Sequence, residues 1–492
     1  MLLPADKILD ALIAEFDRLA PLLADADNEA STAFAIGHAL RLLRAREEGG
    51  AQAVRAQFTR LDGALARVGT ALQGPAALAA WDDVRARAAA EGNLTELEAL
   101  WREGLVAAEH VMVAANRTAV PTGIRAELTG ILAIWEADDL SNQSAAATPS
   151  GHAASLQNAP TLELLTLYLR DRFADESLTV TRGQPLAGGF GKQTTIFDVE
   201  GRALSGSFVM RRDLANEPTI ANDCHSIPPE YAVIRAVRAR GFKAPDALWM
   251  DTEHTLLPGG NFFVMRKAPG QIGGNFFGAR MKVPESLADT LAREMAALHA
   301  LPPLTELGAV TDSIRPELWS LDRAACTERY IRDWYAYFLS ESHLPSPAIA
   351  SLYGWMLDHI PRRSGRPSLL HGDIGFHNFL FEHGEMTALL DWEFCHIGDP
   401  AEELGYVKVT AGAVLDWDLF MRRYVAAGGD PVDDRTLNFF QAWAYLRNAC
   451  AANILASRFM SGDVTDPKAT ILPHHHINHF IAGAEAVIAA AA

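Results

Sequence analysis

The sequence predicts an α+β protein in which an all-α helical segment precedes a small sheet-rich lobe and a larger helical lobe. Three observations support this fold class. Apolar residues recur at three- and four-residue steps from residue 5 to about residue 140, which is the period of amphipathic helices. Short β-prone runs separated by glycine-rich turns then occupy residues 178–265, as expected for a sheet. Beyond Gly270 the helical period returns, interrupted by two short strand-like runs near Leu380 and Leu389.

The first helical segment, residues 1–140, is expected to form a bundle of helices with short connections, because alanine is abundant and runs of β-branched residues are absent. Asn93, three residues before Glu96, forms a capping-box pattern and predicts the start of one of these helices. Small and polar residues without apolar periodicity fill residues 141–160, which predicts a linker. The bundle is then an accessory domain, suited to homodimerisation or to a partner protein.

Two further segments follow the linker. Residues 161–268 combine a short amphipathic helix with strand-like pieces and predict the small lobe. Residues 269–492 are mainly helical and predict the large lobe.

The composition excludes several classes of protein. Hydrophobic residues make up 49% and charged residues 21% of the 492 residues, which is ordinary for a folded chain. The formal net charge of −18 argues against binding to nucleic acid or to anionic membranes, since both require a basic surface. The four cysteines form no CxxC pair, so neither a zinc ribbon nor a disulfide framework is expected. Pro4 and the charged residues after it break the apolar start, so no signal peptide is expected and the cytoplasm is the predicted location.

Three linked motifs carry the chemistry: LLHGDIGFHNFLF at 369–381, ALLDWEF at 388–394 and HIGDPAEELGY at 396–406. Asp373 follows Gly372 in a tight loop, Asn378 lies five residues later, and Asp391 ends an apolar run. Two carboxylates and a carboxamide on loops beside a short hairpin suit a hard divalent cation such as Mg²⁺. The carboxylate that does not bind the metal can accept the proton of an attacking hydroxyl.

This order and spacing resembles the catalytic loop and metal site of kinase-fold enzymes. The variant HGDxxxxN with LDWE and GDPxxEL is similar to the aminoglycoside phosphotransferase and choline kinase family, over residues 160–460. The resemblance implies a bilobal protein-kinase-like fold. It also implies that Asp373 is the catalytic base and that Asn378 and Asp391 bind Mg²⁺ or Mn²⁺.

The resemblance also assigns nucleotide contacts to the small lobe. Glycines in LAGGFGKQTTIFDV, at 186–199, let backbone amides approach phosphate oxygens. In this family a lysine on the next strand contacts the nucleotide phosphates and pairs with a helical glutamate. Here an arginine replaces that lysine, Arg211 with Arg212 left open, and Glu230 matches the helical glutamate. FFVMRKAPG, at 262–270, resembles the segment that joins the lobes and binds adenine. The candidate nucleotide-binding residues are Gly188, Gly189, Gly191, Arg211, Glu230, Met265 and Lys267.

The expected activity is therefore transfer of the γ-phosphate of ATP or GTP to a hydroxyl of a small molecule. Four aromatic residues on one predicted helix face too many directions for all of them to be buried, and some of them are expected to line a groove or an interface. They are Trp334, Tyr335, Tyr337 and Phe338. We therefore expect an apolar or aromatic hydroxyl compound in catabolism, with Trp334 or Tyr337 near it.

Two alternatives stay open: an aminoglycoside kinase, and a non-catalytic nucleotide-binding module that binds a partner protein. A protein acceptor is not expected, because no recognisable activation segment lies between Asp391 and Gly398.

Overall fold

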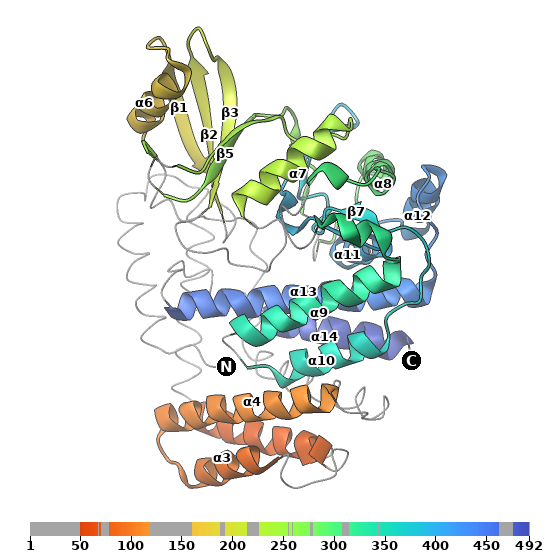
Figure 1. Cartoon of the computed structure of the whole chain (residues 1–492). Coiled ribbons are helices and arrows are strands. Elements are labelled where there is room, and N and C mark those ends of the chain that lie inside the picture. Colours follow the sequence, from red (N-terminus) through yellow and green to blue (C-terminus); the bar gives the residue numbers. More distant parts are fainter. Residues whose placement is uncertain are drawn as a thin grey trace. The chain divides into compact units, whose positions relative to one another are not determined.

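The α+β class is confirmed by the computed structural model (Figure 1). The structure describes residues 50–66, 68–69, 78–117, 160–186, 192–213, 226–253, 255–257, 259–275, 279–307, 314–342, 345–461 and 476–491. The chain divides into two compact units. The first combines Met1–Ser150 with Ile331–Ile360 and Ala442–Ala492, and the second combines Gly151–Tyr330 with Pro361–Gln441.

The described elements of the first unit are all helices. Residues 50–66 are followed by α3 (Ala79–Ala90) and α4 (Leu94–Asn116). The predicted cap of α4 is confirmed, because the Asn93 side chain accepts hydrogen bonds from the amides of Thr95 and Glu96 at 2.9 and 3.2 Å. Phe58 packs edge-on against Trp101, with ring centroids 4.8 Å apart. The expected helices before residue 50 and after residue 117, and the linker before Pro160, lie outside the described residues.

Later parts of the chain complete the first unit. They are the second half of α9 (Arg323–Glu341), α10 (Pro347–Asp358), most of α13 (Asp434–Ser461) and α14 (Ile477–Ala491). The Asn116 side chain donates to the hydroxyl of Tyr335 at 2.9 Å and to the carbonyl of Ala350 at 2.7 Å. The Glu109 carboxylate accepts the amide of Ser346 at 2.9 Å. The N-terminal helices therefore share polar contacts with residues 331–360, while the domain boundaries predicted from the sequence stay predictions.

The second unit begins with α6 (Leu162–Phe173) and a sheet. Among the described residues this sheet has five antiparallel strands in the order β1 (Thr179–Leu186), β2 (Lys192–Glu200), β3 (Gly206–Asp213), β5 (Phe262–Arg266) and β4 (Ala247–Asp251). Helix α6 covers one face, where Tyr168 lies edge-on to Phe262 at 5.4 Å. Helix α7 (Ile227–Ala239) packs on the other face. Successive side chains of a strand alternate between the two faces of the sheet. Each side chain therefore lies either on the face covered by α6 or on the face covered by α7.

The remainder of the second unit places the motif loops on a helical core. Helix α8 (Glu285–His299) packs against short strands. Strand β7 (Ser368–Leu370) pairs with β10 (His396–Gly398), and β8 (Phe379–Glu382) lies between β6 (Gln271–Ile272) and β9 (Glu385–Leu389). Helices α11 (Ala401–Ala411) and α12 (Trp417–Ala426) follow. Strands are thus confirmed near both predicted positions, Leu380 and Leu389.

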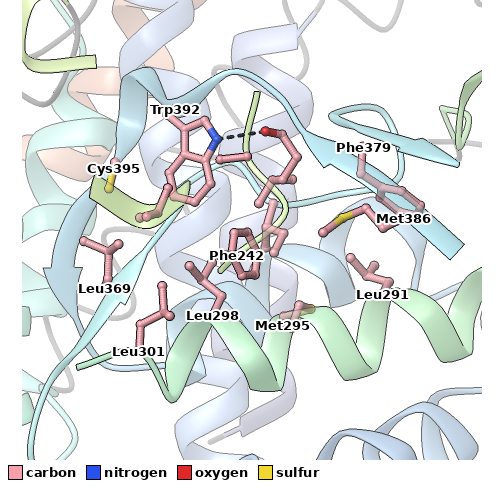
Figure 2. Packing of buried hydrophobic residues seen from close by; sticks show 14 of the residues in the cluster. Phe242, Leu291, Met295, Leu298, Leu301, Leu369, Phe379, Met386, Trp392 and Cys395 are labelled. Atoms are coloured by element: carbon pink, nitrogen blue, oxygen red, sulfur yellow. Dashed lines mark hydrogen bonds between the residues drawn. The ribbon is translucent and has the colours of Figure 1, made fainter. Parts of the chain in front are cut away.

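Buried residues of α8 and of the strands anchor these loops (Figure 2). Leu291, Met295 and Leu298 of α8 belong to the same core as Phe379 and Trp392. The indole nitrogen of Trp392, which is fully buried, donates to the carbonyl of Leu389 at 2.8 Å. The turn after β9 is therefore held both by apolar packing and by a buried hydrogen bond.

Among the described helices, none combines the length and the apolar composition that a membrane-spanning segment requires.

Candidate active site

The loop between β7 and β8 brings Asp373 and Asn378 together, as their spacing predicts. The Asn378 amide nitrogen donates to the Asp373 carboxylate at 2.8 Å and to the Asp373 carbonyl at 2.9 Å. The other carboxylate oxygen of Asp373, Oδ1, lies 3.4 Å from Nε2 of His377. Burial opposes a charged ring, but the Asp373 carboxylate outweighs it and raises the pKa of His377. Asp373 is thus fixed in position, with its side chain 20% exposed to solvent.

A buried glutamate of α11 accepts hydrogen bonds from the backbone of this loop. Glu403 Oε1 accepts the amides of His371 at 2.7 Å and Gly372 at 2.9 Å. Its other oxygen lies 2.6 Å from Nε2 of His299, whose Nδ1 lies 2.8 Å from the hydroxyl of Tyr424. Burial alone would raise the pKa of Glu403, but the hydrogen bond and charge of His299 and the loop amides lower it overall. An ionised carboxylate therefore fixes the backbone just before Asp373.

Asp391 lies beside Asn378 at the end of β9. The amide of Leu390 donates to the carbonyl of Asn378 at 2.6 Å, which ties the two segments together. Asp391 itself adopts a left-handed backbone conformation with φ of 64°, and its carboxylate contacts the guanidinium of Arg211. Partial burial and the charges of Glu393, Glu230 and Asp373 raise the pKa of Asp391 to about 7, although Arg211 opposes the shift.

The structure distinguishes between the two candidate arginines of β3. Arg211 and Val209 face α7, and Nε of Arg211 lies 3.0 Å from Oε1 of the fully buried Glu230. Arg212 follows the opposite alternation with Met210 and lies on the α6 side, with its guanidinium 5.4 Å from the centre of the Phe262 ring. Arg211 is therefore the basic residue that joins the helical glutamate to Asp391.

Two residues that the sequence analysis did not select complete this cluster. Nζ of Lys192, at the start of β2, lies 3.0 Å from Glu230 Oε2 and 3.1 Å from Glu393 Oε2. The same Glu393 oxygen accepts from Arg211 at 3.1 Å. Lys192 directly follows the glycine-rich segment, and Glu393 is part of the DWE motif. The available signal for both residues was their position inside two motifs, LAGGFGKQTTIFDV at 186–199 and ALLDWEF at 388–394.

The sequence profile of the phosphotransferase enzyme family (APH) matches residues 182–443, just over half of the chain. The chain belongs to this family. The matched residues contain the Asp373 loop, Asp391 and the Arg211–Glu230 pair, so family membership and local geometry concern the same site.

Curated relatives align with this chain over only part of their own length. Acyl-CoA dehydrogenase family member 11 of Pongo abelii is 23% identical over 332 residues, which cover 61% of this chain and 41% of that protein. Acyl-CoA dehydrogenase family member 10 of Mus musculus is 23% identical over 278 residues, covering 51% of this chain and 24% of that protein. The match thus spans less than half the length of these relatives.

Solved structures of APH phosphotransferases align with about two thirds of the chain. A ternary complex of aminoglycoside phosphotransferase APH(4)-Ia with AMP-PNP and hygromycin B is 17% identical, with a TM-score of 0.43; the match covers 66% of this chain and 98% of that chain. The GDP and kanamycin complex of APH(2")-IIIa is 18% identical, with a TM-score of 0.42, covering 67% of this chain and 99% of that chain.

The remaining predicted nucleotide contacts, in the glycine-rich segment and between the lobes, stay predictions. Gly188, Gly189 and Gly191 lie outside the described residues. Met265 is buried on β5, between β3 and β4. The amide of Lys267 donates to the carbonyl of Ser207 at 3.0 Å, so this amide is already used within the small lobe. The adenine-binding role of Met265 and Lys267 stays a prediction.

The four aromatic residues of α9 differ in burial, as their spacing along the helix predicts. Trp334 and Phe338 are buried, while Tyr335 and Tyr337 are half-buried. Trp334 packs edge-on against Trp443, and Tyr335 stacks on Tyr353. All six aromatic residues belong to the first unit, whereas Asp373 belongs to the second. A role for Trp334 or Tyr337 at the acceptor therefore stays a prediction.

The oxygen donors of this site fit Mg²⁺ better than they fit a transition metal. The described residues contain no group of three His, Cys, Asp or Glu side chains that could hold a metal ion. A Mg²⁺ ion bound by Asp391 and Asn378 would take its other ligands from water and phosphate. Mg²⁺ prefers this arrangement, because it keeps several waters and binds one or two carboxylates together with substrate phosphates.

Replacement of Gly372 by alanine is expected to destabilise the protein by about 2–4 kcal/mol, through positive-φ strain and overpacking. Gly372 has φ of +81°, and an added Cβ would overlap with the carbonyl oxygen of Phe394. Gly384 provides a matched control, because its φ is +86° but nothing lies within 4 Å of an added Cβ. Chemical denaturation of both variants measures the difference, and equal losses of stability would show that the close contact has no cost.

Proposed function

We propose that the protein is a phosphotransferase that transfers the γ-phosphate of ATP or GTP to a hydroxyl of a small molecule. The single observation that carries the proposal is the convergence of Asp373, Asn378 and Asp391 on adjoining loops, joined through Arg211 to Glu230. Membership of the phosphotransferase family supports the same reaction class. The nucleotide complexes of other APH enzymes support a nucleotide as the phosphate donor.

Each residue then has a defined role. The Asp373 carboxylate accepts the proton of the acceptor hydroxyl, and its hydrogen bond from Asn378 sets the orientation in which it does so. Arg211 contributes positive charge where negative charge develops on the transferred phosphoryl group. Asp391 and Asn378 would hold Mg²⁺ or Mn²⁺, which neutralises phosphate charge when bound. Most of the catalysis then comes from positioning and electrostatics.

We propose an apolar or aromatic hydroxyl compound in catabolism as the acceptor. The aromatic crowding around Trp334 and Tyr337 motivates this choice, and an aminoglycoside is the alternative. The N-terminal helices would serve as a surface for a second copy or a partner protein.

A turnover screen tests the proposal. The purified chain is incubated with ATP or GTP, Mg²⁺ and a panel of phenolic, hydroxyacyl and aminoglycoside compounds, and products are read by mass spectrometry. The gain of one phosphoryl group by a phenolic or hydroxyacyl compound is the expected result. Transfer to aminoglycosides alone would overturn the acceptor class and leave the reaction class standing. Tight nucleotide binding without transfer to any compound would favour the non-catalytic module.

A further inference from the structure

Two cations, rather than one, meet the buried glutamate of α7. Lys192 on β2 and Arg211 on β3 both contact Glu230, at 3.0 Å in each case, and both contact Glu393 at 3.1 Å. Strand register explains why they converge: Arg211 lies opposite Thr194, two residues beyond Lys192, and this alternation directs Lys192 and Arg211 to the same face of the sheet. A single basic residue would be enough to form the ion pair with Glu230.

These four side chains differ in how far they are exposed to solvent. The exposed fraction is 0% for Glu230, 3% for Lys192, 13% for Arg211 and 32% for Asp391. Of the two cations, Arg211 is therefore the more accessible to a ligand from solvent, and Lys192 is the more buried. Lys192 is placed to act on Arg211 and on the carboxylates, rather than on the ligand directly.

The charge balance indicates what Lys192 does. Glu230, Glu393 and Asp391 place three carboxyl groups around Arg211, and Arg211 alone would offset only one negative charge. Guanidinium groups favour two-donor pairing with a carboxylate, so an unshared Glu230 would compete for more of the Arg211 donors. In the structure Arg211 gives only Nε to Glu230 and directs a terminal nitrogen to Asp391 and Glu393.

We propose that Lys192 is a positioning residue: it neutralises Glu230 and Glu393 from the buried side, and thereby keeps the Arg211 guanidinium directed toward Asp391 and the phosphates of a bound nucleoside triphosphate. This inference rests on the proposed function. In the resembling family one basic residue both pairs with the helical glutamate and contacts the phosphates. Here Lys192 of β2 and Arg211 of β3 would share these two roles.

The test is a double-mutant cycle on Mg-ATP binding, measured by calorimetry with the full chain. Lys192→Met keeps the aliphatic stem without the charge and is expected to weaken Mg-ATP binding about tenfold. Arg211→Met is expected to weaken it at least as much. If Lys192 acts through Arg211, adding Lys192→Met to Arg211→Met changes the dissociation constant by less than about twofold. The matched control is Lys243→Met, which removes a lysine paired with Glu294 and Glu385 and should leave Mg-ATP binding unchanged.

Several outcomes would overturn the inference. Unchanged Mg-ATP affinity in Lys192→Met, or fully additive losses in the double variant, would show that Lys192 does not act through Arg211. If Lys192→Met does not fold, Lys192→Gln keeps a hydrogen-bond donor for both carboxylates and carries the same cycle. Absence of phosphoryl transfer in the wild type would instead contradict the proposed function, because the cycle depends on binding and not on turnover.

Discussion

Replacement of Asp373 by asparagine is expected to lower kcat for phosphoryl transfer by about 10²- to 10⁴-fold, the usual contribution of a general base. The carboxamide has nearly the same shape but cannot accept the proton of the acceptor hydroxyl. Because Asp373 is partly exposed and its backbone is held by other groups, the melting temperature should change little. Steady-state kinetics and thermal unfolding of the same preparation measure both effects.

Glu382→Gln is the matched control, since Glu382 is the next carboxylate along the chain and lies exposed at the end of β8. This variant should keep wild-type turnover. Wild-type turnover in Asp373→Asn would remove Asp373 from the role of base, and an equal loss in both variants would indicate a general effect of charge.

Replacement of Asp391 by asparagine is expected to abolish the gain in nucleotide affinity that Mg²⁺ provides. A neutral carboxamide is a much weaker ligand for a hard cation than a carboxylate, and Arg211 also loses one of its three carboxylate partners. Calorimetric titration of ATP with Mg²⁺ and with EDTA should then give similar dissociation constants in the variant. In the wild type, the affinity should be higher with Mg²⁺.

The exposed Asp418 on α12 provides the control for this experiment, because Asp418→Asn makes the same chemical change outside the site. Its metal-dependent gain should equal that of the wild type. A full metal-dependent gain in Asp391→Asn would show that the cation is held elsewhere.

Features that depend on neighbouring residues in the sequence could be predicted well. The helix that begins after Asn93 needs only a capping side chain and the amides that follow it. The approach of Asn378 to Asp373 needs only a five-residue loop. Apolar periodicity indicated the strands on both sides of the hairpin that presents Asp391. These parts of the fold and of the site follow from local geometry.

Features that depend on strand register or on distant partners could not be predicted. The choice between Arg211 and Arg212 depends on which face of β3 is covered by α7, which no local pattern states. Lys192 reaches Glu393, a residue 201 positions away. The pairing of Asn116 with Tyr335, 219 positions apart, likewise places the N-terminal helices in one unit with part of α9. Such contacts are fixed by tertiary packing, and composition carries no signal for them.

The most direct measurement of the central claim is transfer of the labelled γ-phosphate of ATP or GTP to a hydroxyl acceptor, compared between the wild type and Asp373→Asn, with Mg²⁺ and with EDTA. We expect labelled acceptor in the wild type with Mg²⁺. In Asp373→Asn, and in the wild type with EDTA, labelling should fall by about 10² or more. Equal labelling by wild type and variant, or labelling that persists in EDTA, would contradict the claim.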